Sequence, residues 1–215
     1  MPPRRKENPD KADIIIASAA RLFREKGVRA VSIDEIVQAS GIAKGTFYLY
    51  FKTKDDLLEK LAIAVVRQMA RSVAAEGLKE GSSAIDRFIG AVLAMQHVDR
   101  HQQYLVDALN HPENYALHEL TNVQLVRQVA PVLAVIVTQG KKEGVFDVED
   151  AQATLEFLLA GQAMLLGGGR FNWSPQEYAA RLRATFIIIE RSLGTAPGAL
   201  VGLFAALGSA SNEAA

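Results

Sequence analysis

Apolar residues recur at helical spacing along most of this chain, and that spacing limits the folds it can adopt. In the segment Asp10–Lys26, the apolar positions follow one another at steps of four, three and one residues: Ile15, Ala19, Leu22 and Phe23. Side chains at these steps lie on one face of an α-helix, whereas a half-buried strand would need strict alternation. Alternating segments are scarce elsewhere in the chain, so we predict an all-α protein.

Start and stop signals divide the helical pattern into segments. Gly27 can end the first helix because glycine readily adopts C-cap conformations. Ser32 and Glu35 have the spacing of a capping box, and Thr53 precedes the acidic first turn of a long helix. These signals predict helices over residues 10–26, 32–40, 43–49, 53–76, 83–97, 100–110, 114–141, 150–167 and 174–193, with at most one more over 199–207.

Proline and glycine predict interruptions in the later segments. Pro131 lacks a backbone N–H, so it should kink or break the 114–141 helix, which Gly140 and Gly144 are expected to end. The three glycines at 167–169 are predicted to end a helix. They lack the Lys-Ser/Thr pair of a P-loop and the preceding strand of a dinucleotide site.

The charge is divided unevenly, although the 215 residues carry 24 basic and 24 acidic side chains. Residues 1–54 hold 11 basic and 6 acidic residues, whereas residues 55–215 hold 13 and 18. This asymmetry favours contact between the N-terminal part and a polyanion, and chance segregation of surface charge is the alternative. The chain has no cysteine, which excludes disulfides and fits a cytoplasmic location. Its apolar runs fall short of the roughly 20 residues that a membrane helix needs, so no membrane partner is expected.

Residues 32–51 have the plan of a helix-turn-helix: a short helix, a turn at Gly41 and a second short helix. In that motif the second helix lies in the major groove. Lys44 can reach a phosphate or a guanine edge, and Thr46 can contact a thymine methyl. Phe47 and Phe51 should face inward. The expected DNA contacts are cations, hydroxyls and small residues that allow close approach: Ser32, Ala43, Lys44, Gly45, Thr46, Tyr48, Tyr50 and Lys54. An amphipathic scaffold helix with the same polar residues is the alternative, and the pattern alone does not separate the two.

Three blocks of sequence carry a resemblance to a known family. They are AARLFREKG at 19–27, SIDEI at 32–36 and GIAKGTFYLYFKTKDDLL at 41–58. In this order and spacing, over residues 12–60, the chain resembles the TetR/AcrR family of bacterial repressors. The resemblance implies an all-helical homodimer whose N-terminal helices bind a palindromic DNA operator and whose C-terminal domain binds a small-molecule effector that releases it. It carries over the same eight DNA contacts by position, although Ala43 stands where a serine is frequent and removes one hydroxyl contact.

These inferences divide the chain into three parts. Residues 1–54 form the predicted DNA-binding domain with a basic arm, residues 55–194 the effector-binding and dimerisation domain, and residues 195–215 a tail. The predicted dimer seam uses apolar positions of the 150–167 and 174–193 helices: Leu155, Leu158, Leu159, Leu166, Leu182, Phe186 and Ile189. An intrachain core is the alternative for these positions.

A ligand pocket is predicted between the 54–76 helix and the helices over 83–141. Its expected lining combines aromatic and polar side chains: Met69, His97, His101, Tyr104, Asn110, Tyr115, Met164 and Trp173. His97 and His101 have the spacing of a metal-binding pair, but Asp99 is expected to begin a new helix between them, so no metal is expected. Hydrogen-bonded or solvated histidines are the simpler interpretation.

The sequence contains no readable nucleophile–base pair, so neither an enzyme nor a cofactor is expected. The prediction is a sequence-specific DNA-binding regulator released from its operator by a ligand. A helical small-molecule carrier or enzyme without a DNA function is the alternative. The sequence does not separate a repressor from an activator.

Overall fold

The computed structural model describes residues 10–96, 104–105, 108, 111, 114–167, 170–200 and 203. These residues form eight helices and no strand, which confirms the all-α prediction. The helices are α1 (Lys11–Lys26), α2 (Ile33–Ser40), α3 (Lys44–Tyr50), α4 (Lys54–Gly77), α5 (Ala84–Gln96), α7 (Tyr115–Lys142), α8 (Ala151–Leu166) and α9 (Pro175–Leu193). Most of the helix predicted over 100–110 and of that over 199–207 lies outside the described residues, as do Asp99, Gly168 and Gly169.

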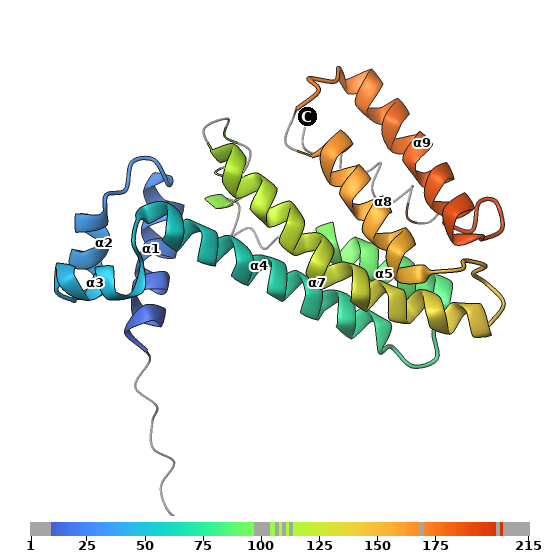
Figure 1. Ribbon diagram of the computed structural model, residues 1–215, viewed down its shortest axis with the longest axis horizontal. Helices are drawn as coiled ribbons and strands as arrows, with labels where there is room; N and C mark the ends of the chain where they lie inside the picture. The colour runs from blue at the N-terminus through green and yellow to red at the C-terminus, as the bar shows by residue number, and fades with distance from the viewer. Residues whose placement is uncertain are drawn as a thin grey trace, which may run out of the picture.

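Helices α1, α2 and α3 gather at one end of the elongated molecule (Figure 1). Their shared apolar core is almost completely buried and includes Ile15, Phe23, Ile36, Phe47 and Phe51. The first turns of α4 complete this core with Leu57, Leu58 and Leu61. From there α4 runs into the second part of the molecule, so one continuous helix contributes to both cores.

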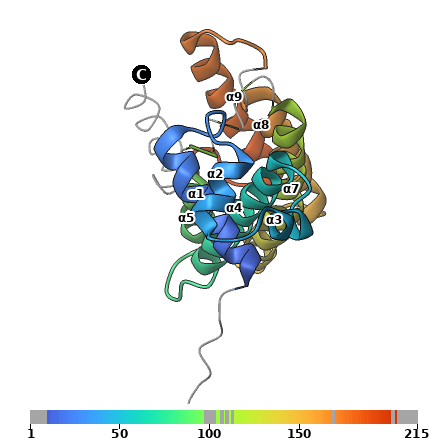
Figure 2. The same cartoon turned by 90° about the vertical axis from the view of Figure 1, so that its left-hand side faces the viewer.

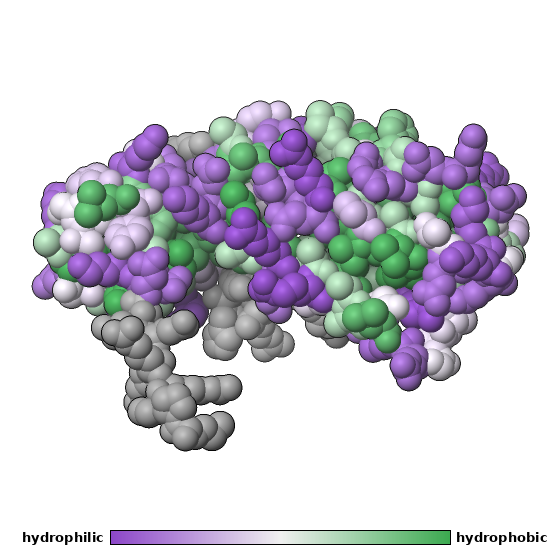
Figure 3. Space-filling model, turned by 60° about the horizontal axis from the view of Figure 1, so that its bottom comes forward, coloured by the Kyte–Doolittle hydropathy of each residue, from purple (hydrophilic) through white to green (hydrophobic). Residues whose placement is uncertain are grey.

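The second core lies among α4, α5, α7, α8 and α9 and includes Val73, Phe88, Leu133, Leu155 and Ile189. Helices α4, α5 and α7 pack closely along their lengths, and α8 adds to α7 on the side away from α4 (Figure 1). The outer surface mixes hydrophilic and hydrophobic residues, and hydrophobic patches are visible in the half away from α1–α3 (Figure 3).

The two parts also meet away from α4. The guanidinium of Arg29, in the turn after α1, donates to Nε2 of His111 at 2.8 Å. The rings of Phe23 and Tyr104 pack with their centroids 6.1 Å apart. The segment between α5 and α7 therefore contacts the α1–α2 turn directly.

The predicted helix boundaries follow from local capping. The hydroxyl of Ser32 accepts from the backbone N–H of Glu35 at 3.2 Å, and the Glu35 carboxylate accepts from the Ser32 N–H at 2.8 Å. The Thr53 hydroxyl accepts from the Asp56 N–H at 3.0 Å. Gly41 ends α2 in the left-handed region at φ 65°, where a Cβ would add strain. These contacts confirm the capping box, the turn glycine and the start of the long helix.

Helix α7 corrects two expectations about interruptions. It continues through Pro131 without a break, because buried neighbours such as Val129 and Leu133 hold both sides of it against the core. Gly140 does not end α7 but lies inside it, buried. A Cβ at Gly140 would lie 2.2 Å from the Phe146 ring, so this glycine permits close packing of the chain that follows α7.

Among the described helices, α7 alone has the length and apolar composition that could span a membrane. It packs against α4, α5 and α8, and a core helix of a soluble protein has the same composition.

Candidate nucleic-acid interface

Helix α3 separates a buried face from an exposed face within seven residues. Phe47 is fully buried and packs against Tyr48 and Phe51, with ring centroids 5.5 and 5.7 Å away. On the other side Lys44, Gly45 and Tyr48 are exposed. Figure 2 shows α2 and α3 on the end of the molecule that faces the viewer, with no other described helix in front of them. This geometry confirms that Phe47 and Phe51 face inward and leaves the opposite side of α3 open to a partner.

Lys44 begins α3 next to a carboxylate of α2. Its Nζ lies 2.5 Å from Oδ1 of Asp34, and both side chains are exposed. The hydrogen bond and charge of Asp34 raise the pKa of Lys44 above its ordinary value. A phosphate that approached Lys44 would compete with Asp34 for its ammonium group.

Small residues keep the start of α3 open. Ala43 is exposed at the N-cap position and makes no side-chain cap hydrogen bond. A Cβ built on Gly45 would meet no atom within 4 Å, so the fold itself does not require glycine there. The lack of a side chain at Gly45 leaves room for another molecule to approach the backbone closely.

The Ser32 hydroxyl is exposed but already engaged in the capping box with Glu35. The Glu35 carboxylate also accepts from Nζ of Lys26 at 2.7 Å. This hydrogen bond, followed by those from Ser32, lowers the pKa of Glu35 to about 2. The cluster fixes the start of α2 and ties it to the end of α1.

Lys54, one of the predicted DNA contacts, makes hydrogen bonds within the protein. Its half-buried Nζ donates to the backbone carbonyls of Val28 and Val31 at 3.1 and 3.0 Å. These bonds hold the α1–α2 turn against the start of α4. Thr46 and Tyr50 are also half-buried, and burial with a nearby Asp10 raises the pKa of Tyr50.

Leu49 on α3 and Lys52 just after it are also exposed, and neither is among the predicted DNA contacts. Leu49 is 82% exposed, an unusual position for a leucine in a small domain. Its spacing of four residues from Gly45 within α3 is a helical period that could have identified it.

Of the predicted pocket residues that the structure describes, Tyr115 and Met164 both contact Arg170, but Tyr104 and Met164 line different hollows. Met69 is half-buried, Tyr115 and Met164 are largely exposed, and Tyr104 packs on Phe23 at the other end of the molecule. Trp173 stacks on Phe171 with centroids 5.0 Å apart. His97, His101 and Asn110 lie outside the described residues. Among the residues that are described, no group of three or more His, Cys, Asp or Glu is suited to a metal.

A cavity of about 560 Å³ lies instead among α5, α7, α8 and α9. All seven residues predicted for the dimer seam line it: Leu155, Leu158, Leu159, Leu166, Leu182, Phe186 and Ile189. Five of these seven are buried within the single chain and two are half-buried. These positions face the interior of the single chain, and α8 also carries apolar residues such as Phe157 on its outer face.

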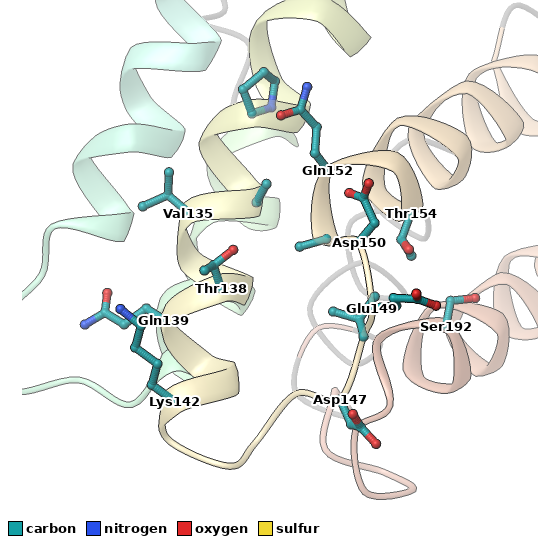
Figure 4. A pocket seen from close by; sticks show the side chains of 14 residues that line it. Val135, Thr138, Gln139, Lys142, Asp147, Glu149, Asp150, Gln152, Thr154 and Ser192 are labelled. Atoms are coloured by element: carbon teal, nitrogen blue, oxygen red, sulfur yellow. The ribbon is translucent and has the colours of Figure 1, made fainter.

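A larger hollow of about 1300 Å³ lies at the end of α7 and the start of α8. Figure 4 shows Thr138, Gln139 and Lys142 on α7 across from Asp147 and Asp150. Most of its lining residues are exposed, including the three acidic ones. This polar groove is open to solvent and lies at the opposite end of the molecule from α3 (Figure 1).

Comparison with known proteins finds two family models that match this chain. Residues 15–61 match the family model described as bacterial regulatory proteins, tetR family, and residues 95–187 match that of the tetracyclin repressor-like C-terminal domain. The two matches occur in this order and together cover more than half of the chain.

Individual curated relatives match over limited stretches of the chain. The HTH-type transcriptional regulator YerO of Bacillus subtilis is 49% identical over 49 residues, which are 23% of this chain and 17% of YerO. EthR of Mycobacterium tuberculosis is 31% identical over 83 residues, 39% of this chain and 38% of EthR. The matched segments span between 17% and 31% of the length of the first four curated relatives.

A solved structure described as a TetR-family regulator from Mesorhizobium loti extends the likeness of fold to both parts of the chain. It superposes with a TM-score of 0.56 at 18% identity and covers 86% of this chain and 98% of that one. The first family model covers the helix-turn-helix, and the second follows it along the chain. This chain therefore belongs to the TetR family of bacterial regulatory proteins.

Proposed function

We propose that this protein is a cytoplasmic transcriptional regulator that binds a palindromic operator as a homodimer and leaves it when a small molecule binds. The observation that carries the proposal is the exposed side of α3. Lys44, Gly45 and Tyr48 lie on it, while Phe47 anchors the helix from within. In a helix-turn-helix this side of the second helix enters the major groove.

A two-fold dimer supplies the second recognition helix that a palindrome requires. Helices α8 and α9 carry an exposed apolar face opposite the cavity. On α8, Phe157 and Met164 are 80% and 47% exposed, and the small Gly161 lies between them. On α9, Ile187 and Ile188 are 52% and 53% exposed. Apolar faces of this kind are normally covered. We therefore assign the dimer contact to this outer face and not to the seven predicted positions, which line the cavity.

Helix α4 is the proposed link between effector and operator. Its first turns pack in the core of α1–α3 and its later turns in the core of α5, α7 and α8. A ligand that shifts α5 or α7 would tilt α4 and change the distance between the two recognition helices. The ligand must bind the released state more tightly for this shift to occur.

The test is selection of bound DNA from a random pool with the full chain. We expect a palindromic site whose affinity falls steeply between about 50 and 200 mM salt, because several phosphates are contacted. Selection of no sequence by a chain with an intact thermal transition would overturn the proposal and favour a helical small-molecule carrier. A repressor and an activator are then distinguished by transcription from a promoter that contains the selected site.

A further inference from the structure

The cavity among α5, α7, α8 and α9 has the size and chemistry of a ligand site. Its volume of about 560 Å³ falls within the range of small-molecule pockets, which is on the order of 300–1,000 Å³. No residue of α4 lines it, so it lies on the far side of α5 and α7 from that helix. The site therefore differs from the one that the sequence predicted between α4 and the 83–141 helices.

The lining decides which ligands the cavity can hold. Among the described residues that line it, none carries a formal charge. Aliphatic and aromatic side chains make up most of the wall, and several of them, including Phe88, Leu133 and Leu158, are buried. A charged ligand would lose its hydration there without gaining an opposite charge, whereas an apolar ligand gains from leaving water.

Three lining side chains offer hydrogen bonds. Asn122 on α7 and Gln162 on α8 are half-buried, and each amide has donor and acceptor atoms. Tyr178 on α9 is 36% exposed, which places it at the rim of the cavity. We propose that this cavity binds an uncharged, largely apolar small molecule that carries one or two hydrogen-bonding groups. The regulatory meaning of this ligand rests on the proposed function, but its binding does not.

Two probes that share one ring skeleton test the charge requirement. N-phenyl-1-naphthylamine is neutral, and 8-anilino-1-naphthalenesulfonate adds a sulfonate to the same rings. Fluorescence titration of the full chain should show saturable binding of the neutral probe at one per chain. The sulfonate should bind at least about tenfold more weakly because its charge stays unpaired. Equal affinities for the two probes would overturn the inference.

Substitutions locate the probe. Ala163→Trp fills the cavity and should weaken binding of the neutral probe at least about tenfold. Ala75→Trp places the same ring on an exposed position of α4 and should leave binding unchanged. Equal binding by both variants would place the probe elsewhere and overturn the inference.

A second variant keeps the test decisive if Ala163→Trp does not fold. Gln162→Glu preserves the volume but adds a charge to the wall, and should weaken the neutral probe by about tenfold at neutral pH. The matched control is Gln68→Glu, which adds the same charge at an exposed position of α4 beside Arg71. Probe binding without selection of any DNA would retain this inference and overturn the proposed function. DNA binding without probe binding would overturn this inference and retain the proposed function.

Discussion

At the scale of single residues, the exposed side of α3 is shaped by what surrounds each side chain. Lys44 is paired with Asp34, Gly45 faces open space and Lys54 is turned inward to two carbonyls. Residue type alone suggested a phosphate contact at both lysines. The structure separates them, because only Lys44 is exposed on the side of α3 that is open to DNA.

The Lys44–Asp34 pair leads to opposite predictions for its two members. Lys44→Ala should weaken binding to the selected operator and reduce the log–log salt slope by about one, because one phosphate contact is lost. Asp34→Asn should strengthen binding, because it removes a negative charge and a competitor for Lys44. Fluorescence anisotropy across a salt series measures both. Normal binding by Lys44→Ala would exclude this lysine from the interface.

Gly45→Ala should affect stability and DNA affinity in opposite directions. The added Cβ meets no atom within 4 Å, and alanine favours helix, so the free energy of unfolding should rise by up to about 1 kcal/mol. Operator affinity should fall if the backbone approaches DNA at this point. Urea unfolding and anisotropy on the same preparation check the two effects, and unchanged affinity would show that Gly45 lies away from the DNA.

At the scale of elements, each short helix has one buried side chain, and only α2 of the two also has a side-chain cap. Helix α3 has a single fully buried residue, Phe47, which explains how seven residues can hold a fixed orientation. Phe47→Ala should lower the free energy of unfolding by roughly 3–5 kcal/mol through loss of apolar contact and formation of a cavity. Chemical denaturation measures this loss. A change below about 1 kcal/mol would contradict the packing.

The cap of α2 predicts a dependence on acid. The folded pKa of Glu35 is about 2, below its ordinary value of 4.5. Its contribution to stability is therefore present above pH 4.5 and is lost as the pH falls toward 2. The melting temperature should fall less between neutral pH and about pH 3 for Glu35→Gln than for the unaltered chain. Equal differences would show that the Lys26 and Ser32 contacts do not stabilise the charged form.

At the scale of the whole molecule, α4 joins the end formed by α1–α3 to the end that holds the proposed ligand cavity, and the outer face of α8 and α9 is the proposed contact with the second copy. Replacing Phe157 and Ile188 with glutamate should give a monomer with weaker operator binding, because two charges then lie in the seam. Sedimentation and anisotropy measure the two effects. Leu78→Glu is the control, because Leu78 is 81% exposed on the turn after α4. An unaltered chain that is already monomeric would contradict the assignment of this face.

The sequence by itself determined the features that depend on neighbours within a few residues. The Ser32 capping box, the Gly41 turn and the Thr53 cap all form between groups three or four positions apart, so their geometry is contained in the local sequence. The inward face of Phe47 followed in the same way from the helical period.

Tertiary structure alone decided which apolar surfaces face inward. Helix α8 is apolar on both faces, with Leu155 and Leu158 buried and Phe157 exposed, so no periodicity could separate cavity from seam. Pro131 stays within α7 because packing on both sides outweighs a lost hydrogen bond, and Lys54 turns to carbonyls more than twenty residues away. These outcomes depend on contacts distant in sequence, whose energies only the assembled core supplies.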